Sequence, residues 1–167
     1  LFSPREVQER WFERQVAAAL SLGLPLILHE RDSGGRFLAL LQAAGPGSLR
    51  GVVHCFTGSD AELEAYLDLG LAIGVTGILT HAQRGVELRR QATRIPAERL
   101  LVETDAPYLT PTPERNRHRR NEPAFVRTTL LKLAEVRGED AASLAGAVWG
   151  NTCRLFGVDG GSDPSDR

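Results

Sequence analysis

Methionine is absent from this chain of 167 residues, and cysteine is scarce. Because translation begins at methionine, we expect a fragment that lacks its natural amino-terminal part; an intact domain trimmed of its first residue is the alternative. The two cysteines, Cys55 and Cys153, are too few for a disulfide framework, which favours a reduced, cytoplasmic setting. No apolar run is long enough for a membrane span or a signal peptide, so no membrane association is expected.

An excess of charge of one sign is also missing. The 21 acidic and 20 basic residues leave a net charge of -1, so the whole molecule has no general attraction to nucleic acid. Any phosphate binding must come from a local basic patch. The hydrophobic share of 42% and the charged share of 25% are typical of one globular domain, and nothing indicates an obligate protein partner.

The chain does contain helical patterns that alternate with short apolar runs. Capping boxes at 3–6 and 59–62 begin two helices, which end at Gly23 and near Gly70. Further helices are expected over about 36–44, 84–94, 122–136 and 141–156. Continuous apolar runs, typical of buried parallel strands, lead to His29, His54, Val75 and Asp105.

This order of elements predicts an α/β fold. A helix comes first, a strand and a helix then alternate four times, and one more helix follows; such alternation implies a parallel sheet with right-handed crossovers. A closed barrel of this kind has eight strands and about 250 residues, so four strands correspond to half of a (β/α)8 TIM barrel. We predict one domain over 1–157 and a disordered tail over 158–167, which is rich in Gly, Asp and Ser.

Three of the strands lead to residues that can bind a metal: His29, His54 and Asp105. The carboxyl ends of parallel strands open onto one face of a barrel. His29 and His54 each share a strand face with the apolar residue two positions earlier, and Asp105 shares one with the apolar residue four positions earlier. All three side chains are therefore expected to point toward the interior of the barrel. We predict that they bind one or two divalent cations, Zn, Mn or Mg. The alternative for each histidine is a hydrogen-bonded structural role.

The neighbours of these residues suggest further roles. Asp105 is the expected catalytic carboxylate, because it can take a proton from a metal-activated water or orient it. Glu103 is expected to be a hydrogen-bond partner of a ligand rather than a ligand itself. Cys55 is expected to face the core, and His81, in a loop after the third strand, is expected to be exposed.

Arginines near the strand ends suggest phosphate recognition. We predict that Arg31, Arg119 and Arg120 contact the substrate, since guanidinium groups match phosphate oxygens. Arg115 and Arg117 belong to the same loop as the last two. A solvated, salt-bridged loop is the alternative. Tyr108 could stack on a base or anchor its loop.

Several stretches closely resemble the TatD family of metal-dependent deoxyribonucleases. They lie at 28–32, 53–58, 74–77, 101–109 and 120–123, and Asn151 with 155–157 resembles the family's usual ending. The resemblance implies a (β/α)8 barrel that cleaves phosphodiester bonds in DNA, as an exonuclease acting on single strands or ends. It also implies that this chain is the carboxyl-terminal half of the barrel.

The resemblance extends to individual residues. His29 and His54 match the family's metal-binding histidines on the fifth and sixth strands, and Asp105 matches the aspartate of the eighth. The family's first-strand histidines and its fourth-strand bridging glutamate have no counterpart in this sequence. An inactive or binding-only fragment is therefore one alternative. Hydrolysis of carboxylic esters or amides, including the removal of amino acids from transfer RNA, is another.

Overall fold

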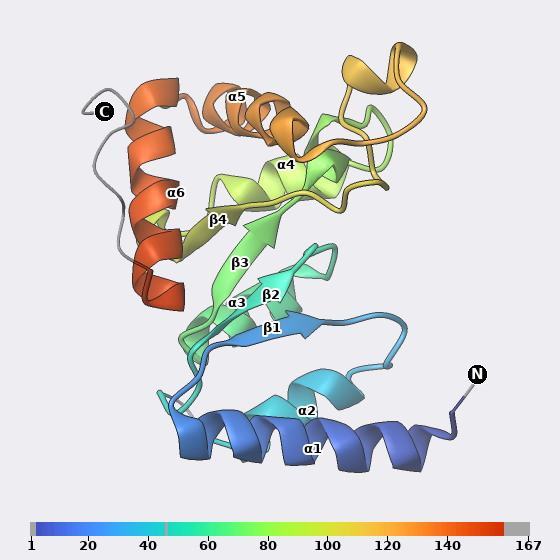
Figure 1. The fold of residues 1–167 in the computed structure, drawn as a ribbon, viewed down its shortest axis with the longest axis vertical. Coiled ribbons are helices and arrows are strands. Elements are labelled where there is room, and N and C mark those ends of the chain that lie inside the picture. Colours follow the sequence, from blue (N-terminus) through green and yellow to red (C-terminus); the bar gives the residue numbers. More distant parts are fainter. Residues whose placement is uncertain (1–2, 46, 159–167) are drawn as a thin grey trace.

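Four parallel strands form a single sheet in the order β1-β2-β3-β4 (Figure 1). The computed structural model describes residues 3–45 and 47–158. The strands are β1 (Leu26–His29), β2 (Gly51–His54), β3 (Ala72–Val75) and β4 (Leu100–Val102). The predicted fold class is confirmed. Apart from Val158, the predicted tail lies outside the described residues.

Helices connect the strands. They are α1 (Arg5–Leu22), α2 (Arg36–Ala43), α3 (Asp60–Asp68), α4 (Val86–Ala92), α5 (Val126–Arg137) and α6 (Ala141–Phe156). Short 3-10 turns are η1 (Gly77–Thr80), η2 (Ala97–Arg99), η3 (Glu114–Asn116) and η4 (Pro123–Phe125). No helix within the described ranges is long and apolar enough to cross a membrane.

Three helix starts differ from the sequence prediction. The capping box expected at 3–6 does not form, because α1 begins one residue later and Pro4 occupies the capping position without a side-chain hydrogen bond. The capping box at Ser59 does form, with Glu62 as its reciprocal partner. The helix expected over 122–136 starts as the 3-10 turn η4, with Pro123 at its first position. α4 is also shorter than the expected 84–94.

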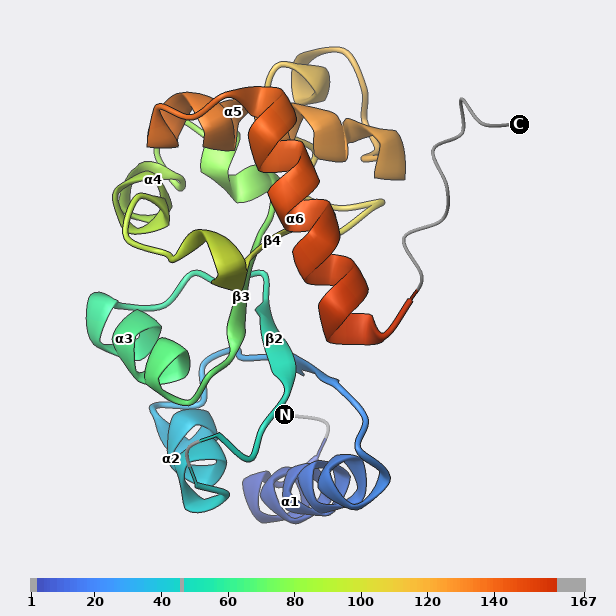
Figure 2. The ribbon, with the colours of Figure 1, turned by 90° about the vertical axis from the view of Figure 1, so that its left-hand side faces the viewer.

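The sheet has two unequal apolar faces. Leu28 and Val53 belong to the main core, together with side chains from α2 and α3 such as Leu41 and Leu63. The opposite face carries a small cluster of Val52, Ala72 and Leu101, which packs against the last turn of α6. Figure 2 shows α6 on the other side of the sheet from α3. This alternation is the one that the parity of the strands predicts.

Candidate metal centre

The two strand-end histidines lie side by side. Strand register pairs His29 of β1 with His54 of β2. Their ring centroids are 5.4 Å apart, with an interplanar angle of 44°. His29 is exposed, whereas His54 is partly buried. The parallel register therefore brings both imidazoles to the carboxyl edge of the sheet.

Two carboxylates from the segment after β4 contact His54. Nδ1 of His54 lies 2.9 Å from Oε2 of Glu103, and Nε2 lies 2.9 Å from Oδ1 of Asp105. The contact with Glu103 raises the pKa of His54 above its ordinary value against the opposing effect of partial burial, and the negative charges of Glu103 and Asp105 add to the rise. The imidazole is thus held between two acidic groups.

Local backbone features make room for this contact. A methyl group on Gly74 would overlap the carboxylate of Glu103, so glycine at this position lets Glu103 reach across β3. Cys55, directly after His54, has a left-handed φ of 53° and donates its backbone N–H to Glu103. Such a φ is costly for a residue with a Cβ and is found at functional sites. The backbone of β3 and the end of β2 therefore both accommodate the carboxylate of Glu103.

The side chain of Cys55 lies between the main core and Asp105. It packs against the main core, and its Sγ lies 3.6 Å from Oγ1 of Thr76. Burial raises the pKa of the Cys55 thiol to about 12, so this thiol stays protonated at neutral pH. The expectation that Cys55 faces the core is confirmed.

The donor set suits a divalent cation. Oδ1 of Asp105 is buried and lies 2.9 Å from Nε2 of His54. Imidazole and carboxylate are ligands that zinc and manganese accept. Within residues 3–45 and 47–158, however, no three histidine, cysteine, aspartate or glutamate side chains are arranged to hold one ion. Both ring nitrogens of His54 are turned to carboxylates. Metal binding by His29, His54 and Asp105 therefore stays a prediction.

The arginines expected to contact substrate fall into separate places. Arg31 lines a groove of about 820 Å3 together with His29 and residues of α1, and lies 3.8 Å from its exposed neighbour Asp32. Arg119 lines a different pocket of about 480 Å3, formed by the loops after β3 and β4. Arg120 is exposed beside it. The structure does not gather the three arginines into one surface.

Two residues of this second pocket, His81 and Arg84, were not predicted as site residues from the sequence. His81 was expected to be exposed, and that expectation is wrong: its residue exposure is 6%, and its Nε2 lies 3.0 Å from the carbonyl oxygen of Thr110. Arg84 also lines the pocket. Both follow β3, and the end of this strand carries no residue that could bind a metal. The only sequence signal for them was their position after a strand that ends at the same edge of the sheet.

A parallel α/β sheet with histidines and carboxylates gathered at its carboxyl edge is the arrangement found in hydrolases built on TIM barrels. A family comparison makes the assignment more specific. The chain belongs to the family of TatD related DNases, whose model matches residues 1–157. The resemblance predicted from the motifs is thereby confirmed.

Individual relatives agree with this assignment. A curated relative from Rahnella sp., named 3'-5' ssDNA/RNA exonuclease TatD, is 48% identical over 159 residues, which cover 94% of this chain and 60% of the relative. The solved structure of a TatD homologue from Escherichia coli K12 matches with a TM-score of 0.82 and 32% identity, covering 92% of this chain and 58% of that one. A TatD family hydrolase from Entamoeba histolytica gives a TM-score of 0.81 with 26% identity, covering 95% and 59%. The chain thus spans about three fifths of the proteins it matches.

Proposed function

We propose that this chain carries part of the active site of a metal-dependent nuclease that removes nucleotides from an end of single-stranded DNA or RNA. The observation that carries the proposal is the imidazole of His54 held between Glu103 and Asp105 at the carboxyl edge of a parallel sheet. The names of the relatives support the same substrate class. A cytoplasmic location, as the cysteine content predicts, is part of the proposal.

His29, His54 and Asp105 are the proposed ligands of one or two divalent cations, with Zn, Mn and Mg as the candidates. A cation bound there would lower the pKa of a nearby water and stabilise negative charge on a phosphate. Glu103 holds Nδ1 of His54, which fixes the orientation of the ring. Oδ1 of Asp105 lies 2.9 Å from Nε2 of His54, next to the proposed ligands, so Asp105 is the group proposed to accept a proton during hydrolysis.

Arg31, Arg119 and Arg120 are proposed to contact phosphates of the substrate strand. Arg119 and Arg120 form no ion pair with a carboxylate among the described residues, and both are exposed. Arg31 has only a long contact with Asp32, and the side chains of both are largely exposed. Their guanidinium groups are therefore free to meet phosphate oxygens.

The test compares Asp105→Asn with Asp68→Asn, an exposed control on α3. Mn2+ binding to the chain is measured by calorimetry, and release of nucleotides from a labelled single strand is measured with and without Mn2+. We expect Asp105→Asn to abolish Mn2+ binding and nucleotide release, while circular dichroism shows that the fold is unchanged. The control should behave like the unchanged chain.

Two outcomes contradict the proposal. A chain that binds no metal and releases no nucleotide is an inactive fragment. A chain that hydrolyses an acyl ester but not a phosphodiester at the same Mn2+ concentration is an esterase instead.

A further inference from the structure

A basic pocket lies beside the candidate metal centre. Its volume is about 480 Å3, and its walls come from the loops after β3 and β4. Arg84, Arg115, Arg117 and Arg119 line it, and none of the described residues that line it is acidic. Four guanidinium groups in one pocket are notable in a chain of net charge -1. Like charges repel, so their gathering favours an anionic ligand.

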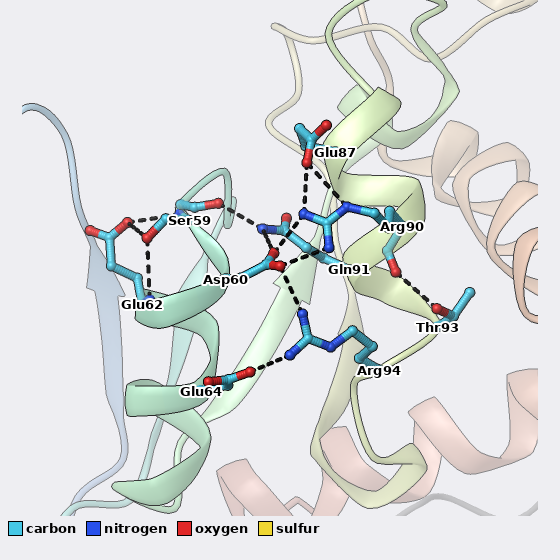
Figure 3. A network of polar contacts seen from close by, with 10 residues as sticks. Ser59, Asp60, Glu62, Glu64, Glu87, Arg90, Gln91, Thr93 and Arg94 are labelled. Carbon is cyan, nitrogen blue, oxygen red and sulfur yellow. Dashed lines mark hydrogen bonds and ion pairs between the residues drawn. The ribbon is translucent and has the colours of Figure 1, made fainter.

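The arginines of this pocket differ from Arg90 in α4 and Arg94 just after it. Arg90 of α4 pairs with Asp60 at 2.7 Å and with Glu87 at 2.7 Å. Arg94 pairs with Asp60 at 2.9 Å and also with Glu64 (Figure 3). By contrast, the four pocket arginines make no ion pair with a carboxylate in the described part of the chain. The pocket arginines therefore carry positive charge that no carboxylate of the described residues offsets.

A buried polar group adds a second, independent observation. His81 lines the pocket with only 6% of its surface exposed. Its Nε2 lies 3.0 Å from the carbonyl oxygen of Thr110, whereas its Nδ1 is buried without a hydrogen-bond partner. Buried polar atoms are nearly always hydrogen-bonded, so an unpartnered one is typical of a site awaiting a ligand or a water.

The two walls are fixed to each other. The backbone N–H of Thr112 donates to Oγ1 of Thr80 at 2.8 Å. Gly77 permits the close approach, because a methyl group there would lie 2.5 Å from the carbonyl oxygen of Leu109. On the β3 side, Arg89 donates to the carbonyl oxygens of Leu79, His81 and Ala82. The pocket is therefore held by the fold.

We propose that this pocket binds an internucleotide phosphate of a single strand, at a position other than the bond being cleaved. Tyr108 also lines the pocket, is 74% exposed, and offers a ring on which a base can stack. Its backbone N–H donates to the carbonyl oxygen of Asp105 at 2.6 Å, which ties the pocket to the metal centre. The proposal rests on the nuclease function proposed above, since that function supplies the strand.

The test measures strand binding without cleavage. Fluorescence anisotropy of a short labelled oligothymidylate is recorded in EDTA for Arg84→Gln, Arg117→Gln and the matched control Arg10→Gln, an exposed arginine of α1. We expect each pocket variant to raise the Kd about tenfold, as the loss of a charge-assisted hydrogen bond implies. The slope of log Kd against log salt should fall by about 0.7 per lost phosphate contact. The control should keep both values.

A second arm tests the base. Tyr108→Ala should weaken binding of the oligothymidylate but not of an abasic strand of equal length. Pocket variants that bind like the unchanged chain overturn the proposal. Displacement of the strand by thymidine monophosphate at equal concentration also overturns it, because the pocket would then hold the released product.

Failure here is separable from failure of the nuclease proposal. Weaker binding in the pocket variants without any metal-dependent cleavage refutes only the nuclease. Unchanged binding together with cleavage that depends on Asp105 refutes only the pocket.

Discussion

Gly74 of β3 and Glu103, just after β4, face each other so closely that a methyl group on Gly74 would overlap the Glu103 carboxylate. The same carboxylate contacts His54 on the next strand over. The glycine on β3 therefore leaves room for Glu103, which follows β4, to contact the imidazole of His54 on β2.

Gly74→Ala should destabilise the protein by about 1–3 kcal/mol, the usual cost of overpacking, because Glu103 must leave its place. Urea unfolding measures the change. Gly146→Ala is the control: Gly146 lies in α6 with open space around it, so alanine there should stabilise by about 0.5–1 kcal/mol. Equal effects at both sites would contradict the role of Gly74.

Glu103→Gln should weaken Mn2+ binding about 10–100-fold while leaving the proposed ligands in place, since partners that orient a ligand typically have effects of this size. Calorimetric titration with Mn2+ measures it. Glu98→Gln, an exposed substitution in η2, serves as the matched control. An affinity that Glu103→Gln leaves unchanged would remove Glu103 from the site.

Asp60→Asn should lower the free energy of unfolding at neutral pH and have less effect in acid. The hydrogen bonds from Arg90 and Gln91 lower the pKa of Asp60 below its ordinary value. A depressed pKa contributes stability above the ordinary pKa of aspartate, about 3.9, and that contribution is lost as the pH falls toward the lower folded value. Urea midpoints between neutral pH and pH 3 measure the difference, which should also shrink in high salt. Asp68→Asn should show no such trend.

Asn151→Ala should cost about 2–3 kcal/mol. Asn151 is buried, and its Nδ2 donates to the carbonyl oxygens of Ala97 at 2.7 Å and Leu100 at 2.8 Å. Its removal leaves two carbonyl groups without this donor, one in η2 and one at the start of β4. Thermal and urea unfolding check the value against Asn116→Ala, at an exposed position at the end of η3. A cost below that of the control would show that α6 does not depend on this contact.

The strands of the sheet could be predicted from the sequence because buried parallel strands are continuous apolar runs whose side chains alternate between two faces. Apolar runs located β1 and β2, and the parity of Val52 and Val53 assigned the two faces correctly. Helix starts were harder, because a serine two residues before a helix, as at Ser3, reads like a cap. His81 could not be placed, because its burial depends on Thr110 from a loop 29 residues away.

The arginines show the same limit. Arg31 and Arg119 both follow strand ends and were both predicted to contact the substrate, yet they line different pockets. Loop conformation decides where a long side chain ends up, and local sequence patterns carry little information about it.

His29 and His54 are paired on adjacent strands, whereas the pocket arginines lie in the segments that follow β3 and β4. The position of the histidine pair and the binding of a ligand in the pocket therefore depend on different parts of the molecule. Strands in a packed sheet tolerate little rearrangement, whereas loops accept substitutions readily. Natural variation or engineering can therefore alter how firmly and in what sequence context a ligand is held while the histidine pair stays as it is.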